Sequence, residues 1–144
     1  MKPYPHNYAV EATVESTGSV KLLAAGLPTI LSAPPVEFDG PGDLWSPESL
    51  LVAALADCFA LTFQGIARVN RLEWSQLVCR AEGDLDRREG VTRFLSFRVH
   101  ARLMLPPGAD EAKGRSLLAK AEKACLVKNS LAGSVELLVD VVAS

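Results

Sequence analysis

Alternation of apolar and polar residues predicts short strands at the start of the chain. Across residues 8–15 every second residue is apolar, which is the period of a strand with one buried face. The alternation returns over 20–24, and the Ser-Thr-Gly-Ser segment at 16–19 is typical of the turn of a hairpin. Residues 26–33 are a candidate third strand, with Pro28 at an edge or at the strand start.

A long apolar helix is predicted to follow a proline-rich loop. Ser46 can cap free backbone N–H groups, Pro47 suits the first helical position, and Glu48 favours the positive end of the helix dipole. We expect this helix to run to about Arg71. It is apolar on nearly all sides through Phe63, which is typical of a central helix covered on most faces.

The rest of the chain predicts strands around a second helix. The expected elements are strands at 77–82, 95–103 and 135–141, a charged turn at 84–90, a helix capped by Asp110 and a loop at 129–133. The order βββ-α-ββ-α-β, with strands joined as hairpins, indicates an α+β fold rather than a parallel βαβ array. We expect a single domain over residues 1–144.

Composition excludes several classes of protein. The net charge of −2 offers no basic excess for nucleic acid, so no nucleic-acid partner is expected. The apolar run 50–63 is interrupted by Asp57 and is too short to span a membrane. Three cysteines do not make a secreted disulfide scaffold, and residues 1–6 carry no signal-peptide pattern. The sequence therefore predicts a soluble cytoplasmic protein.

Charge is unevenly divided between the two halves of the chain. Residues 1–67 hold seven acids and two bases, a sum of −5, whereas residues 68–144 hold ten acids and thirteen bases, a sum of +3. The first arginine is Arg68. Because the two halves have net charges of opposite sign, they are expected to contact each other, either within one chain or across a dimer. Binding to a polyanion is less favoured.

Cysteines are the strongest candidates for chemistry. Cys58 lies on an apolar stripe of the first helix, and Cys125 lies on the apolar face at the end of the second. Taken singly, each is typical of a small buried hydrophobe, as is Cys79 on the core face of a strand. Two helices packed on one sheet would bring the first two stripes together, and facing thiols could form a disulfide if the geometry permits.

The sequence gives little indication of a histidine-based site, a metal site or a phosphate-binding site. His6 lies near the terminus, and His100 alternates with arginines on the polar face of a strand. No Cys/His spacing is typical of a metal site, and no glycine-rich phosphate loop is present.

Two segments resemble the OsmC/Ohr family of osmotically inducible and organic hydroperoxide resistance proteins. Residues 46–59, S-P-E-S-L-L-V-A-A-L-A-D-C-F, resemble the family signature N-P-E-E-L-L-x-A-A-L-A-x-C-F. Residues 121–131, A-E-K-A-C-L-V-K-N-S-L, resemble A-x-x-x-C-P-V-S-N-S-L. The chain length, the order of elements and the separation of the cysteines also fit, so the resemblance covers nearly the whole chain.

The resemblance implies a cofactor-free thiol peroxidase in oxidative stress defence. Cys58 matches the cysteine that attacks the peroxide, Cys125 the one that resolves it as a disulfide, and Glu48 the glutamate that helps to hold the site. The implied partners are an organic hydroperoxide and a dithiol reductant, for which a lipoyl-type dithiol is one candidate. The implied fold has antiparallel sheets around two central helices in an intertwined homodimer.

Departures from the family pattern keep a second function open. Peroxide-active members use an arginine from the N-terminal region, but no arginine precedes Arg68. Lys21 and Lys128 are candidate replacements, although Lys128 also fits a solvated loop lysine. Asp57 beside the thiol would oppose its ionisation. The alternative is therefore an OsmC-like dimer that binds a small apolar or thiol-reactive ligand with little or no peroxidase activity.

The position of Glu48 in the predicted helix is compatible with three different roles. Ten residues separate it from Cys58, about 15 Å along a straight helix and roughly 80° in rotation. Either the first helical turn bends away, or Glu48 serves the Cys58 of another chain, or it only complements the helix dipole.

Overall fold

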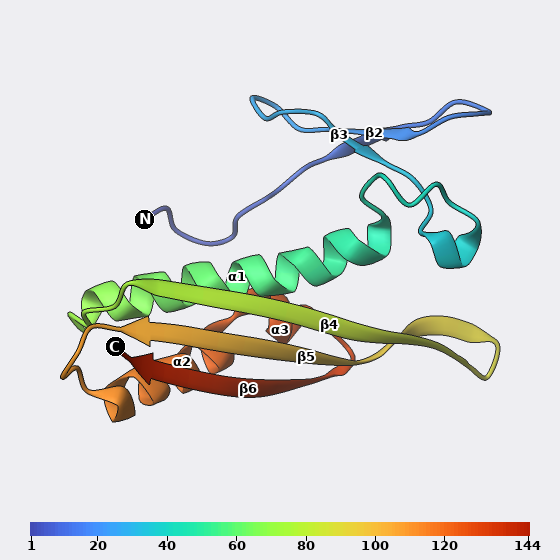
Figure 1. The fold of residues 1–144 in the computed structure, drawn as a ribbon. Coiled ribbons are helices and arrows are strands. Elements are labelled where there is room, and N and C mark those ends of the chain that lie inside the picture. Colours follow the sequence, from blue (N-terminus) through green and yellow to red (C-terminus); the bar gives the residue numbers. More distant parts are fainter. The chain divides into compact units, whose positions relative to one another are not determined.

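The computed structural model describes residues 1–144, which divide into two compact units, 1–51 and 52–144. The expected α+β class and the predicted order of the main elements are confirmed. Figure 1 shows the elements of both units in chain colours.

The first unit contains a small antiparallel sheet. Its strands are β1 (Glu11–Thr13), β2 (Val20–Leu23) and β3 (Ile30–Ser32), in the order β1-β2-β3, followed by a 3-10 turn η1 (Val36–Phe38). Gly18 occupies the left-handed region with φ 94° in the turn between β1 and β2, a conformation that glycine adopts without steric cost. The two strands expected from the alternation and the candidate third strand are confirmed, and each is shorter than predicted.

Helix α1 (Pro47–Val69) begins where the sequence predicts. Ser46 Oγ accepts the backbone N–H of Ser49 at 3.1 Å, and Ser49 Oγ accepts the N–H of Ser46 at 2.9 Å. Two otherwise free donors are thereby satisfied reciprocally. The helix ends before Arg71, which adopts a left-handed φ of 53°.

The second unit is built on a three-stranded sheet in the order β4-β5-β6. Its elements are β4 (Gln76–Arg88), β5 (Val91–Leu105), α2 (Glu111–Ala124), α3 (Leu126–Ser130) and β6 (Ser134–Ala143). Asp110 caps α2 as predicted, accepting the N–H of Lys113 at 3.0 Å. Strands β4 and β5 form an antiparallel hairpin. The expectation of antiparallel pairing is wrong for β5 and β6, which are parallel because α2 carries the chain between them.

Two segments expected to be irregular are regular. The charged segment 84–90 continues the hairpin, with the turn at Glu89 and Gly90, whose φ angles are 52° and 77°. Its side chains are exposed on both faces, so no apolar alternation marks it as a strand. Likewise, the first two residues of the expected loop 129–133 belong to α3, where Ser130 Oγ donates to the carbonyl of Leu126 at 2.7 Å.

The core of the second unit lies on one face of its sheet. Helices α1 and α2 both cover that face (Figure 1). The buried side chains include Leu55, Phe59 and Phe63 of α1, Phe97, Val99 and Leu103 of β5, and Leu117, Leu118 and Ala121 of α2. This packing fixes how α1 is rotated about its axis, and therefore where its thiol points.

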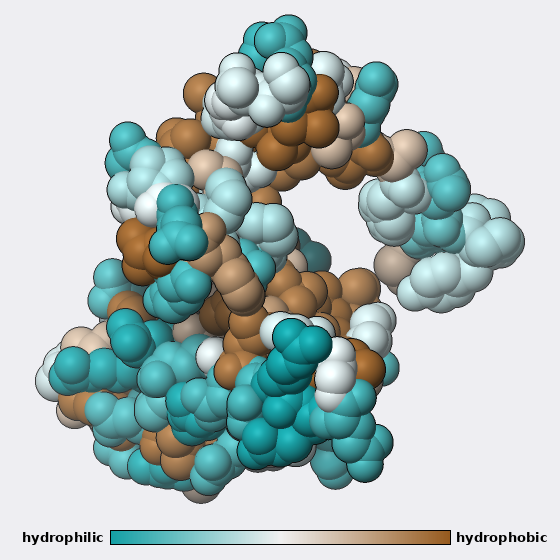
Figure 2. Space-filling model, turned by 90° about the vertical axis from the view of Figure 1, so that its right-hand side faces the viewer, coloured by the Kyte–Doolittle hydropathy of each residue, from teal (hydrophilic) through white to brown (hydrophobic).

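Helix α1 remains largely uncovered in the single chain. It is long and apolar enough to cross a membrane by length and composition alone, with a mean hydropathy of 1.8 over 18 residues, yet only 22% of that window is buried. Leu61 is 60% and Val69 78% exposed. Figure 2 shows hydrophobic surface, in brown, at the level of α1 above the hydrophilic surface of the second unit. Within the second unit, the sheet and α2 therefore leave much of the surface of α1 exposed.

Candidate active site

Cys58 and Cys125 come together inside the second unit. Burial of Leu55 and Phe59 against the sheet leaves Cys58 at the edge of the core, partly exposed, with its Sγ 4.0 Å from Thr62 Oγ1. Cys125, between α2 and α3, is fully buried. The Cys58 side chain lies close enough to act on the ionisation of the Cys125 thiol, and both cysteines are free thiols. The apolar stripes of the two helices therefore meet as the sequence suggests.

The surroundings of Cys125 act on its ionisation in both directions. Burial raises the pKa of the thiol above its ordinary value, and the Cys58 side chain adds to this effect. The backbone N–H groups of Lys128 and Val127, in helix α3, act to lower the pKa of the thiol. Burial has the largest effect, so the neutral thiol is favoured. The N–H groups of Val127 and Lys128 favour the thiolate.

A pocket of about 410 Å³ opens beside Cys58. Its other lining residues are Ala54, Asp57, Leu61 and Thr62 of α1 with Leu126 and Val127 of α3. Leu126 is 68% exposed at its edge. Cys125 does not line the pocket, so a reagent entering from this side meets Cys58 first.

Neither candidate cation is paired with the thiols. The Lys128 ammonium lies 4.0 Å from Glu122 Oε1, and it makes no ion pair with any other group. Lys21 is an exposed residue of β2 in the first unit. The electrostatic contribution of residue 128 to the site comes from its backbone N–H, not from its side chain.

Glu48 lies in the first turn of α1, within the first unit. Its Oε2 is buried and has no hydrogen-bond partner. A buried carboxylate oxygen without a donor is unfavourable, so a donor from outside this environment would be stabilising. Whether Glu48 serves a thiol of its own chain or of another stays a prediction from the sequence.

The remaining sequence candidates show no sign of chemistry at the thiol pair. Cys79 packs with the core cluster, and burial raises the pKa of its thiol to about 11. His6 is exposed, and its Nε2 lies 2.9 Å from the Lys2 carbonyl. No group of three or more His, Cys, Asp or Glu side chains is placed to hold a metal ion.

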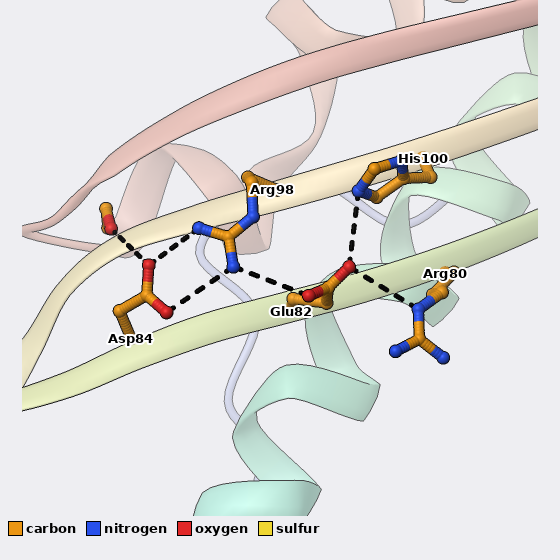
Figure 3. A network of polar contacts seen from close by, with 6 residues as sticks. Arg80, Glu82, Asp84, Arg98 and His100 are labelled. Atoms are coloured by element: carbon orange, nitrogen blue, oxygen red, sulfur yellow. Dashed lines mark hydrogen bonds and ion pairs between the residues drawn. The ribbon is translucent and has the colours of Figure 1, made fainter.

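A polar network covers the opposite face of the sheet. The Arg98 guanidinium donates to Asp84 Oδ2 at 2.6 Å and to Glu82 Oε2 at 3.4 Å, and His100 Nε2 lies 3.3 Å from Glu82 Oε1 (Figure 3). Hydrogen bonds from Arg98 lower the pKa of both carboxyl groups. These side chains are substantially exposed, so each pair contributes little to stability. The network stands on the face away from the thiols.

Sequence reasoning missed the amide donors at Cys125. The sequence analysis expected a loop at 129–133 and no helix at 126–130, whereas the structure has helix α3 there, with the N–H groups of Val127 and Lys128 acting on the Cys125 thiol. The absence of glycine and proline between 126 and 130 is a signal that could have indicated another helical turn.

Comparisons with known proteins agree with this architecture. The chain is 30% identical over 106 residues to the uncharacterized protein YmaD of Bacillus subtilis, covering 72% of this chain and 71% of that one. An OsmC-like protein of unknown function from Vibrio cholerae superposes with a TM-score of 0.84 at 17% identity, covering 96% of this chain and all of the other. An organic hydroperoxide resistance protein OsmC from Legionella pneumophila gives 0.75 at 24% identity, covering 96% and 98%.

The assignment of the chain to a family rests on a match of its sequence to a family profile. The sequence profile of OsmC-like proteins matches residues 40–139, which include Glu48, Cys58 and Cys125. At identities below 25% the structural likenesses establish the fold. With most of the chain matched by the profile, and with this fold, the protein belongs to the OsmC-like family.

Proposed function

We propose that this protein is a cytoplasmic cysteine-based peroxidase that reduces organic hydroperoxides in oxidative stress defence, without a cofactor. One observation carries the proposal: Cys58 lines an apolar pocket, while the buried Cys125 thiol lies close enough to Cys58 for that side chain to raise its pKa. A nucleophile open to a substrate and a second thiol within reach are what disulfide-forming peroxide reduction requires. The name of the Legionella pneumophila relative agrees with this chemistry.

The reaction follows from these positions. The Cys58 thiolate attacks one oxygen of the hydroperoxide, the O–O bond breaks, and the leaving alkoxide takes a proton to give the alcohol. Cys58 is then a sulfenic acid. The Cys125 thiolate attacks its sulfur, the S–O bond breaks as the disulfide forms, and the leaving hydroxide takes a proton from solvent to become water. The N–H groups of Val127 and Lys128 would stabilise the Cys125 thiolate at the moment of attack.

The reductant is a dithiol, with a lipoyl-type compound as one candidate. One of its thiolates attacks the Cys58–Cys125 disulfide, and its second thiol displaces the protein sulfur from the mixed disulfide. Both protein thiols are restored and the dithiol leaves as a cyclic disulfide.

The pocket favours substrates with an alkyl group. Leu61, Leu126 and Val127 present apolar surface beside the thiol. An alkyl chain gains free energy when it is transferred from water to such a surface, whereas hydrogen peroxide has no apolar group to transfer. Organic hydroperoxides should therefore react faster than hydrogen peroxide.

We propose further that the active form is a homodimer. Only 22% of the apolar window of α1 is buried in one chain, and an uncovered apolar surface of this kind marks an interaction site. A second copy would cover α1 and would bring the −5 half of one chain to the +3 half of the other.

Consumption of cumene hydroperoxide with a dithiol reductant tests the proposed activity. Wild type should consume it catalytically and Cys58→Ser should not, because serine is not ionised at neutral pH. Cys79→Ser is the matched control, since Cys79 packs with the core on β4, away from the pocket lining, and it should keep the wild-type rate. Equal, slow consumption by wild type and Cys58→Ser would exclude the peroxidase.

One observation favours the ligand-binding alternative. Residues 1–67 contain no arginine, and the Lys128 ammonium is paired with Glu122. If the peroxide assay fails, a folded dimer that binds an apolar or thiol-reactive ligand in the Cys58 pocket is the function to test.

A further inference from the structure

We propose that the Thr62 hydroxyl is a catalytic group that donates a hydrogen bond to the Cys58 thiolate and thereby favours its formation. In the reaction with hydroperoxides this role rests on the proposed function. In the ionisation of the thiol it rests only on the contact between the two side chains within helix α1.

Thr62 is an unusual residue for its place in α1. Within residues 50–63 only Asp57 and Thr62 carry a side-chain oxygen or nitrogen. Threonine is also a poorer helix former than the alanine and leucine residues around it. Thr62 follows Cys58 by four residues, so the two side chains lie on the same face of the helix, one turn apart. The hydroxyl on this stretch of apolar helix is therefore the one that lies next to the thiol.

The hydroxyl of Thr62 has the sulfur of Cys58 as its hydrogen-bond partner. Thr62 Oγ1 lies 4.0 Å from Cys58 Sγ, and the structure gives this hydroxyl no other partner. Serine and threonine hydroxyls in helices often donate to the carbonyl four residues earlier, as Ser130 Oγ does to Leu126 at 2.7 Å. Thr62 instead has the sulfur of the residue four positions earlier as its partner. Its proton is therefore available to the thiol.

Ionisation of Cys58 fixes the direction of this hydrogen bond. In the neutral pair either group can donate, but a thiolate has no proton and can only accept. The Thr62 hydroxyl is then the donor, and hydrogen bonds to ionised groups are shorter and stronger than those between neutral groups. The bond therefore stabilises the thiolate more than the thiol. Because the thiolate is the nucleophile, this raises the fraction of reactive protein at neutral pH.

The other ionisable groups around Cys58 give its thiolate little support. Asp57 lines the same pocket and opposes the formation of a second negative charge. Cys125 is buried, and a thiol is a weak hydrogen-bond donor. The Lys128 ammonium is paired with Glu122. A hydroxyl in contact with the sulfur is the stronger donor among these neighbours.

The contact between Thr62 and Cys58 does not depend on the state of assembly. Both residues belong to one turn of α1, so a second copy that covers this helix would not separate them. Such a cover would exclude water from the contact. The hydrogen bond would then be stronger, because hydrogen bonds gain electrostatic energy in a medium of low dielectric constant.

Titration of the thiolate tests the hydrogen bond without peroxide chemistry and without the entry of a reagent. A thiolate absorbs in the ultraviolet, so the difference between each protein and its Cys58→Ser counterpart reports the ionisation of residue 58. Thr62→Val keeps the shape of the side chain but lacks the hydroxyl. Its titration midpoint should rise by about half a pH unit to one pH unit, or roughly three- to tenfold in thiolate fraction at neutral pH. Thr62→Ser keeps the hydroxyl and should titrate like wild type.

Two further variants control for changes in folding and in side-chain type. Thr62→Ala removes the same hydroxyl and introduces the best helix former, so its midpoint should move in the same direction. Thr92→Val, the same change at an exposed position of β5, should leave the midpoint unchanged. Equal midpoints in wild type, Thr62→Val and Thr62→Ala would overturn the inference, as would a shift of the same size in Thr62→Ser.

A second arm follows the oxidation of Cys58 by cumene hydroperoxide in a single turnover. At neutral pH Thr62→Val should react about two- to fourfold more slowly than wild type, because fewer molecules are ionised although each thiolate is more nucleophilic. Well above the midpoint it should react at least as fast as wild type. A rate lowered by the same factor at every pH would show a structural role and overturn the inference. If the midpoint shifts but no protein consumes the hydroperoxide, the hydrogen bond stands and the proposed peroxidase fails.

Discussion

The thiol of Cys125 lies close enough to Cys58 for that side chain to raise its pKa, yet Cys58 alone of the two lines a pocket. This relationship gives the two cysteines different access to reagents. The partly exposed thiol meets the substrate first, and the buried thiol can react with little else than its neighbour.

Replacement of the buried thiol should stop the cycle after one turn. In Cys125→Ser the nucleophile at residue 58 remains, but no thiol can displace its sulfenic acid. We expect about one equivalent of hydroperoxide to be consumed, followed by a stall with further oxidation of Cys58. Stopped-flow peroxide loss and intact mass check this. Sustained wild-type turnover by the variant with the dithiol would show that Cys125 is not required for resolution.

The resolving step should accelerate with pH. Burial raises the pKa of Cys125, so the thiol is mainly protonated at neutral pH, and the thiolate that attacks is a minor species. Its fraction grows about tenfold per pH unit until the pH reaches the raised pKa. The lifetime of the Cys58 sulfenic acid, measured by trapping with dimedone between pH 6.5 and 9.5, should shorten accordingly. A lifetime independent of pH would contradict this electrostatic description.

Neutralising Glu48 should slow the reaction without abolishing it. Its Oε2 is buried without a donor in the single chain, so the implied role is to hold a donor that is supplied elsewhere. Loss of one charge-assisted hydrogen bond of about 1.5 kcal/mol corresponds to roughly tenfold in rate. We expect Glu48→Gln to lower kcat/KM by about that factor, with Glu37→Gln as an exposed control. An unchanged rate would leave Glu48 with only its helix-dipole role.

The exposed apolar helix should make the protein dimeric. Because most of α1 is uncovered in one chain, we expect sedimentation to find a homodimer at micromolar concentration. Its stability against unfolding should rise with protein concentration, since association and folding are coupled. A stable, folded monomer under these conditions would refute the dimer.

Local signals in the sequence predicted much of the fold. The serine cap at Ser46 and the Asp110 cap mark helix starts that the structure confirms. Parallel pairing of β5 with β6 could not be predicted, because the alternation of a strand states which face is buried but not which neighbour it pairs with. The strand structure of the charged end of the β4–β5 hairpin was not predicted, because side chains on both of its faces are exposed to solvent and show no apolar alternation.

The candidate site was predictable in part for similar reasons. Two apolar helical stripes carrying Cys58 and Cys125 predict that the thiols face each other, and the structure packs Cys58 against the core cluster that contains Cys125. The donors to Cys125 are backbone groups of Val127 and Lys128, which no side-chain pattern reveals. Asp57 was noticed as a neighbour of Cys58 in sequence, but only the packed helices show that both line one pocket.

Peptide mapping after oxidation with one equivalent of cumene hydroperoxide tests the proposed chemistry most directly. The expected product is a single intrachain disulfide between Cys58 and Cys125, reopened by a dithiol. Cys79 should remain a free thiol, because it is packed with the core and burial raises its pKa to about 11. A main disulfide that contains Cys79, or a protein in which Cys58 stays reduced while peroxide persists, would contradict the assignment of Cys58 and Cys125 as the redox pair.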